Sequence, residues 1–325
     1  MPSIVSPVDG ARLFYTDYRP SATGSDESAS PAFSPADLRT AAIPRDFTLV
    51  FLHGWPFSSE MYTHLTLPLS QNHHDRCIAP DRRGFGRSEW TGPKDAGEIT
   101  YETFAHDTVA ILDAANITGD WAWVAASMGP GESVLAQEIL DRAEVGSKLQ
   151  RLGAACKGFL WLGPSLPYPL KSDANPTAPG REVWDSILGG FRADRVGFVK
   201  VAIDGVFGSR KEMGLDIELP PTKIEYFEHI IRQADALAVE RCPIIITGKD
   251  FSENLRGLNK RVLVLHGDGD QGMPASASAL LIKDLVPNGL CEVKIYEKAA
   301  HGLFLTHADK VMEDLLQFIV SVSAA

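Results

Sequence analysis

The sequence has few cysteines, a deficit of basic residues and no long apolar run. Its 325 residues include four cysteines, which lie far apart without a Cys-x-x-Cys pair. That spacing argues against a disulfide framework and favours buried free thiols. Lysine and arginine number 31 against 42 acidic residues, which gives a net charge of −11. A surface for nucleic acid or anionic membrane needs clustered basic side chains, so neither partner is expected.

The N-terminus also lacks a basic stretch followed by an apolar one, the pattern of a secretory signal. No run approaches the roughly 20 apolar residues that a membrane-spanning helix needs. These absences predict a cytoplasmic protein without a membrane partner. The hydrophobic content of 44% is that of an ordinary globular protein with a sizeable core.

Short apolar runs separated by helical patterns follow one another along much of the chain. Such runs are typical of parallel strands that are covered on both faces. The sequence therefore predicts an α/β fold with a mostly parallel, doubly wound sheet, preceded by an N-terminal hairpin. The expected sheet strands are residues 47–52, 77–79, 121–126, 158–162, 262–265 and 293–296.

Two segments interrupt this alternation. Residues 19–46 are rich in serine, alanine and proline and are expected to form an exposed insertion. Residues 163–258 contain helical patterns without strands, and they predict a helical cap on a core formed by residues 1–162 and 259–325. The clearest helical stripe in the cap consists of Ile224, Phe227, Ile230, Ile231, Ala234 and Leu237.

The expected strand 121–126 ends at Ser127, and Gly129 and Pro130 follow. Small residues two positions before and after Ser127, Ala125 and Gly129, are typical of a nucleophile elbow. In that elbow a strained strand-to-helix turn exposes a serine hydroxyl at the edge of the sheet. Ala-x-Ser-x-Gly replaces the usual Gly-x-Ser-x-Gly, so the pattern is weak evidence by itself.

A serine nucleophile needs a base and a carboxylate that orients the base. Two acids, Asp268 and Asp270, follow the expected strand 262–265, and His301 follows the strand 293–296. This is the chain order Ser, Asp, His that an α/β hydrolase triad requires. His266 precedes the acids, so it is expected to be structural, and His307 is expected at the surface.

The cluster His73-His74-Asp75 resembles a metal site but lacks a fourth ligand, and it is interpreted as a solvated loop without metal. The backbone N–H groups that would stabilise an oxyanion are expected from Met128, after the nucleophile, and from Trp55 in the sequence His-Gly-Trp-Pro. His53 at the start of that sequence is expected to pack structurally.

The motifs together resemble the α/β-hydrolase superfamily, and most closely its cofactor-free, non-haem haloperoxidase, perhydrolase and arylesterase branch. The resemblance rests on HGWP (residues 53–56), DRRGFGRS (81–88), AASMGPGE (125–132), SDANP (172–176), KDFSENL (249–255), HGDGDQ (266–271) and HGLFLTH (301–307). It extends from about residue 8 to residue 319, apart from the insertion.

The resemblance implies that Ser127 is the nucleophile, His301 the base and Asp270, rather than Asp268, the acid. It implies an oxyanion hole made by Trp55 and Met128, no metal and no cofactor. The function expected is hydrolysis of a small carboxylic ester or lactone through an acyl-enzyme, with perhydrolysis as the alternative within the same chemistry. A slow-turnover ligand-sensing protein of the same fold is the alternative from another class.

Overall fold

A computed structural model describes residues 2–20, 47–73, 75–95 and 97–323. In these ranges, eight strands form one sheet in the order β1-β2-β4-β3-β5-β6-β7-β8. The insertion expected at residues 19–46 lies, apart from its first two residues, outside the described residues. The strands are β1 (Ser3–Val5), β2 (Arg12–Tyr18), β3 (Thr48–Leu52), β4 (Arg76–Pro80), β5 (Trp121–Ala126), β6 (Cys156–Leu162), β7 (Arg261–Gly267) and β8 (Cys291–Tyr296).

The last six strands are parallel to one another, whereas β1 and β2 form an antiparallel hairpin that extends the sheet beyond β4. All residues of β3 and β5 are buried. Continuous apolar runs are expected in strands that are covered on both faces, and each predicted run lies within or overlaps an observed strand. The predicted mostly parallel, doubly wound sheet is confirmed.

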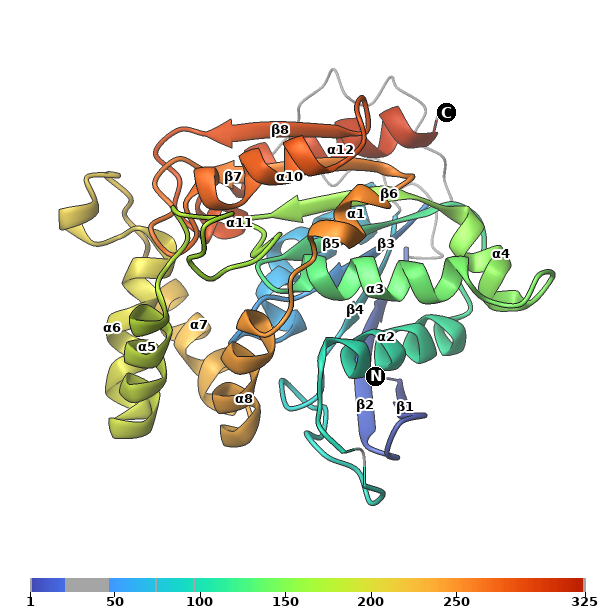
Figure 1. Ribbon diagram of the computed structural model, residues 1–325, viewed down its shortest axis with the longest axis horizontal. Helices are drawn as coiled ribbons and strands as arrows, with labels where there is room; N and C mark the ends of the chain where they lie inside the picture. Colours follow the sequence, from blue (N-terminus) through green and yellow to red (C-terminus); the bar gives the residue numbers. More distant parts are fainter. Residues whose placement is uncertain (1, 21–46, 74, 96, 324–325) are drawn as a thin grey trace, which may run out of the picture.

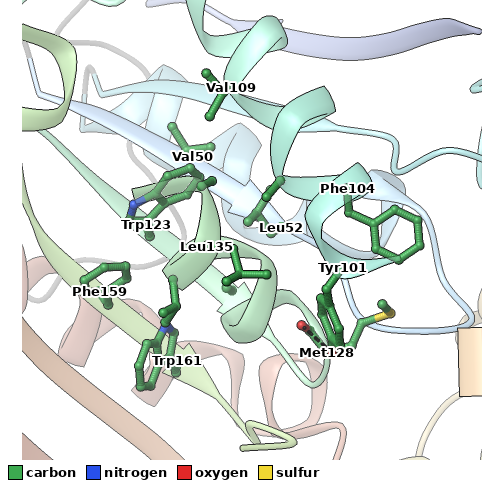
Figure 2. Packing of buried hydrophobic residues seen from close by; sticks show 14 of the residues in the cluster. Val50, Leu52, Tyr101, Phe104, Val109, Trp123, Met128, Leu135, Phe159 and Trp161 are labelled. Atoms are coloured by element: carbon green, nitrogen blue, oxygen red, sulfur yellow. Dashed lines mark hydrogen bonds between the residues drawn. The ribbon is translucent and has the colours of Figure 1, made fainter. Parts of the chain in front are cut away.

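Helices cover both faces of the sheet (Figure 1). One face carries α2 (Tyr101–Ala115), α3 (Gly129–Asp141) and α10 (Ala279–Leu285), and the other carries α1 (Thr63–Asn72) and α12 (Ala308–Ser323). Figure 2 shows strand side chains such as Val50, Leu52 and Trp123 around Leu135 of α3. None of the helices in the described ranges is long and apolar enough to cross a membrane.

Five α-helices lie between β6 and β7 in the chain, and we call them the inserted helices. They are α5 (Arg181–Ala193), α6 (Arg195–Phe207), α7 (Pro221–Gln233), α8 (Ala236–Thr247) and α9 (Ser252–Arg256). In Figure 1, α5 to α8 gather at the side towards which the arrows of β6 and β8 point. The carboxyl ends of parallel strands are where ligands bind in such sheets.

The stripe predicted to lie on one helix is divided between two. The helix α7 ends at Gln233, and Leu237 lies in α8 with 54% of its surface exposed. The break occurs because the Asp235 side chain accepts hydrogen bonds from the N–H groups of Leu237 and Ala238 and so begins a new helix. Helical spacing alone did not reveal this cap.

Candidate active site

Ser127 occupies a strained turn directly after β5. Its φ angle of 56° lies in the left-handed region, which residues other than glycine rarely adopt and which costs on the order of 1 kcal/mol. The N–H of Ser127 donates to the carbonyl of Leu162 at 3.0 Å, and its own carbonyl accepts from the N–H of Ser165 at 2.8 Å. The loop after β6 therefore holds the turn in place.

The surroundings of this turn demand small residues. A Cβ atom on Gly129 would lie 2.6 Å from the carbonyl oxygen of Leu52, and one on Gly54 would lie 3.0 Å from Cβ of Ser127. Ala125, which stands where glycine is usual, is fully buried in β5. Because the left-handed turn at Ser127 is present, the additional methyl group does not prevent it.

His301, in the loop after β8, is paired with an acid from the loop after β7. Its Nδ1 lies 2.6 Å from Oδ2 of Asp270, whose other oxygen accepts from the N–H of Met273 at 2.8 Å. Asp268 instead accepts from the N–H of Ala299 at 3.3 Å. The structure thus brings His301 to Asp270 and not to Asp268.

Burial and charge act in opposite directions on this pair. Burial alone would lower the pKa of His301, but the charge of Asp270 and the hydrogen bond between them raise that pKa above its usual value of 6.5. Burial would raise the pKa of Asp270, whereas His301 and the other hydrogen bonds bring it below 3.8. Both pKa shifts favour the form in which His301 is protonated and Asp270 is ionised. This is the form that His301 adopts after it takes up a proton.

Ser127 and His301 are not hydrogen-bonded to each other in the described structure. Oγ of Ser127 lies 3.4 Å from Oγ of Ser165. Two residues before Ser165, a Cβ atom on Gly163 would lie 3.4 Å from Nδ1 of His301. One short loop after β6 therefore touches both Ser127 and His301, and it places them at the same edge of the sheet.

The two expected oxyanion donors each follow a residue of the strained turn or one close to it. Met128 directly precedes α3, and its carbonyl accepts from the hydroxyl of Tyr101 at 3.3 Å (Figure 2). Trp55 follows Gly54, which closely approaches Ser127. Within the described part of the chain, the backbone N–H groups of Trp55 and Met128 donate to no other residue. An oxyanion donor needs an N–H group without such a partner, so this finding is compatible with the expected role.

A buried ion pair beneath the site was not predicted from the sequence. Nε of Arg82 lies 2.6 Å from Oε2 of Glu132 in α3, and both side chains are only 2% exposed. Arg82 also donates through its guanidinium to the carbonyl of His53 at 2.8 Å and through its backbone N–H to Nε2 of His53 at 2.9 Å. His53 is buried, as expected, and the ion pair fixes the start of the Trp55 loop against α3.

The other histidines and the possible metal cluster occupy distinct places. His266 is buried and lies 3.6 Å from Asp270, so it contacts the acid although the chain order excluded it as the base. Asp75 is 1% exposed, so its interpretation as part of a solvated loop was wrong. A polar tripeptide does not always form a surface link: Asp75 lies directly before β4 and is buried together with most of that strand. Among the described residues, no group of three or more potential ligands could hold a metal ion.

Comparisons with known proteins agree with the geometry. A model of the alpha/beta hydrolase family matches residues 49–314. A non-heme chloroperoxidase of Kitasatospora aureofaciens is 30% identical over 83% of this chain and 91% of its own length. A bifunctional esterase/perhydrolase of Acinetobacter calcoaceticus is 28% identical over 86% of this chain and 94% of its own length.

Among solved structures, an esterase of Exiguobacterium antarcticum superposes with a TM-score of 0.76 at 20% identity and covers 98% of each chain. At that identity the likeness shows the fold. Together with the family match over most of the chain, it leads to one conclusion. The chain belongs to the alpha/beta hydrolase family, in the branch that contains the non-haem haloperoxidases.

Proposed function

We propose that the protein is a serine hydrolase that cleaves a small carboxylic ester or lactone through an acyl-enzyme. The observation that carries the proposal is the strained Ser127 at the sheet edge that also holds the 2.6 Å pair of His301 and Asp270. A strained serine and a histidine oriented by a buried carboxylate are the parts that acyl transfer needs. The relatives named as a perhydrolase and as an esterase support the same chemistry.

Acylation begins when Nε2 of His301 takes the proton of the Ser127 hydroxyl. Nδ1 of His301 faces Asp270 and carries the other proton, so Nε2 is the free base. Oγ of Ser127 then bonds to the carbonyl carbon, and the N–H groups of Trp55 and Met128 bind the resulting oxyanion. As the ester C–O bond breaks, His301 gives its proton to the leaving alcohol.

Deacylation repeats these steps with water as the nucleophile. His301 takes a proton from water, the hydroxide oxygen bonds to the acyl carbon, and the bond to Ser127 breaks as His301 returns the proton to Oγ. Hydrogen peroxide can replace water at this stage and would release a peracid. The named activity of the Acinetobacter relative favours this second reaction as an alternative outcome of the same acyl-enzyme.

We also propose that residues 163–258 form a cap over the site, carried by a core of residues 1–162 and 259–325. The support is the position of the inserted helices at the carboxyl side of the strands (Figure 1). Trp55 also contacts α5 through Phe191 and α8 through Val239. Side chains of these helices would then set the size of the acyl group that is accepted.

Initial rates on a panel of aryl esters, alkyl esters and lactones test the proposal. Turnover by the wild-type protein and its loss by about 10⁴-fold or more in Ser127→Ala are expected. An unchanged thermal melt of the variant checks that its fold is intact. A variant that keeps nearly the full rate would contradict the assignment of Ser127.

The time course separates a hydrolase from a ligand-sensing protein of the same fold. A hydrolase gives steady product release over many turnovers. One equivalent of product followed by near silence would favour a sensor that becomes acylated and stays so. Addition of hydrogen peroxide to the same assay, with detection of peracid, measures how the acyl-enzyme divides between water and peroxide.

A further inference from the structure

The helix α8 contains a proline whose effect reaches the proposed oxyanion hole. Pro243 lies inside α8 and has no N–H, so the carbonyl of Val239, four residues earlier, lacks its usual helical donor. Val239 is 2% exposed, and a buried carbonyl without a partner would be costly. Another group must therefore bind this oxygen.

The missing donor comes from the loop after β3, 184 residues away in the sequence. Nε1 of Trp55 donates to the carbonyl oxygen of Val239 at 3.1 Å. The same indole packs edge-on against Phe191 of α5, with 5.3 Å between ring centroids. The Trp55 side chain is thus bonded to α8 and packed against α5. These two inserted helices also contact each other.

The helix α8 is itself held on the core close to this bond. The N–H of Asp235, which caps α8, donates to the carbonyl of Gly84 at 2.7 Å. A Cβ atom on Gly84 would lie 2.3 Å from Cβ of Ala238, so the helix and the loop of residues 81–88 are in close contact. Val239 follows Ala238, and its carbonyl therefore has a defined position relative to the sheet.

The backbone of the Trp55 loop is held from the other side by Arg82, which binds the carbonyl and ring of His53. One end of the loop is thus fixed by the core and the Trp55 side chain by α8. Only two rotatable side-chain bonds separate the indole from the backbone whose N–H we assign to the oxyanion. A shift of the indole must consequently move that N–H or strain the side chain.

We infer that Pro243 and Val239 of α8 are positioning residues for the oxyanion hole, which they align through the Trp55 indole; this rests on the proposed function. The Val239 carbonyl, which lacks a helical donor because of Pro243, accepts the indole hydrogen bond of Trp55. This bond restricts the position of the Trp55 backbone N–H. Loss of the hydrogen bond between Trp55 and Val239 is expected to displace the Trp55 backbone N–H by up to about 1 Å. Displacements of that size slow the chemical step more than they weaken ground-state binding.

The test begins with Trp55→Phe, which keeps a ring against Phe191 and removes the indole N–H. The inference predicts a kcat about 10- to 100-fold lower and a KM within about threefold of wild type on an aryl ester. The inhibition constant of phenylboronic acid, which forms a tetrahedral adduct with a serine nucleophile, rises in parallel with the loss of kcat. The melting temperature also falls, because the Val239 carbonyl loses its partner.

A second variant separates positioning from stability. In Trp55→Phe/Pro243→Ala, the new backbone N–H at residue 243 satisfies the Val239 carbonyl within the helix. The inference predicts that the melting temperature recovers while kcat and the affinity for phenylboronic acid stay at the level of Trp55→Phe. Recovery of kcat together with stability would overturn it, because the bond would then serve the fold alone.

Trp184→Phe is the matched control. Trp184 of α5 also donates its indole N–H to a carbonyl, that of Pro169 at 2.9 Å, but it does not belong to the Trp55 loop. The control is expected to lose stability and to keep kcat, and an equal loss of kcat in both variants would overturn the inference. Ser127→Ala separates the two proposals, since wild-type turnover in that variant means that the proposed function fails. If Ser127→Ala is inactive and Trp55→Phe keeps its kcat, the present inference alone fails.

Discussion

His301 and Asp270 titrate as a pair, and their separation of 2.6 Å makes each sensitive to the other's charge. His301 must be neutral to act as a base, so activity is lost as the pH falls through its pKa. Since Asp270 raises that pKa above 6.5, we expect the acidic limb of kcat/KM to have its midpoint above 6.5 in the wild-type protein.

Asp270→Asn should move that midpoint to lower pH and lower kcat by about 10⁴-fold. Without the carboxylate, burial remains and lowers the pKa of His301. The measurement is a pH profile of kcat/KM for both proteins, with Asp268→Asn as the control. Asp268 bonds to the N–H of Ala299, so its variant should keep the wild-type midpoint. A midpoint that stays in place in Asp270→Asn would contradict the account.

Asp75 is a buried carboxyl group whose oxygens have no hydrogen-bond partner among the described residues. Burial raises its pKa from 3.8 to about 7. The folded protein therefore binds this proton more tightly than the unfolded chain does. Stability from this group is complete below pH 4 and is lost as the pH rises from about 4 to about 7.

Asp75→Asn removes this loss because asparagine carries no charge at any pH. We expect the free energy of unfolding of the variant to exceed that of wild type by about 2–4 kcal/mol at pH 8. The difference should shrink as the pH approaches 4. Urea unfolding at pH 4, 6 and 8 measures this, and a difference that does not change with pH would refute the interpretation.

At the scale of elements, the helix α3 is fastened to the sheet edge by Glu132. This residue pairs with Arg82 at 2.6 Å and accepts from the Thr108 hydroxyl of α2 at 2.5 Å. Removal of one partner from a buried ion pair leaves an uncompensated charge and typically costs 3–5 kcal/mol. The pair therefore joins α2, α3 and the loop of residues 81–88 into one support for the elbow.

Glu132→Gln keeps the shape of the side chain and removes its charge. Its free energy of unfolding should fall by about 3 kcal/mol in urea titrations at pH 7. The control is Glu138→Gln in the same helix. Its side chain is 27% exposed, and its partners are the exposed Arg142 and the Asn254 amide, so this variant should cost about 1 kcal/mol or less. Equal losses in the two variants would show that the buried pair has no special role in stability.

The strands were more predictable than the inserted helices. Strands covered on both faces need continuous apolar runs, so the run 121–126 gave the bounds of β5 directly. The end of α7 was missed because the cap at Asp235 interrupts an apolar spacing that reads as continuous. The spacing of apolar residues therefore predicts which residues are buried. It does not predict where a helix ends, for which the capping side chain must be identified as well.

Among site residues, the chain order of Ser127, Asp270 and His301 follows from the order of β5, β7 and β8 in the fold. Their placement at one sheet edge was therefore predictable from the sequence. The contacts of Arg82 with Glu132 and of Trp55 with Val239 were not. They join residues 50 and 184 positions apart, and no local spacing rule connects such pairs.

At the scale of the whole molecule, the loops that follow the parallel strands meet at one edge, beside the inserted helices (Figure 1). Ser127, Asp270 and His301, the proposed triad, lie in these loops, and α8 contacts Trp55, the proposed oxyanion donor. Two serine hydroxyls lie 3.4 Å apart there, those of Ser127 and Ser165. Of these two residues only Ser127 has a strained backbone, so the proposed mechanism places the reaction on Ser127.

The most direct test of this assignment is covalent labelling with a fluorophosphonate, followed by intact-protein mass spectrometry and peptide mapping. The account predicts one adduct per chain, located on Ser127, with labelling abolished in Ser127→Ala and retained in Ser165→Ala. An adduct on Ser165, or steady ester turnover without any adduct on Ser127, would contradict it.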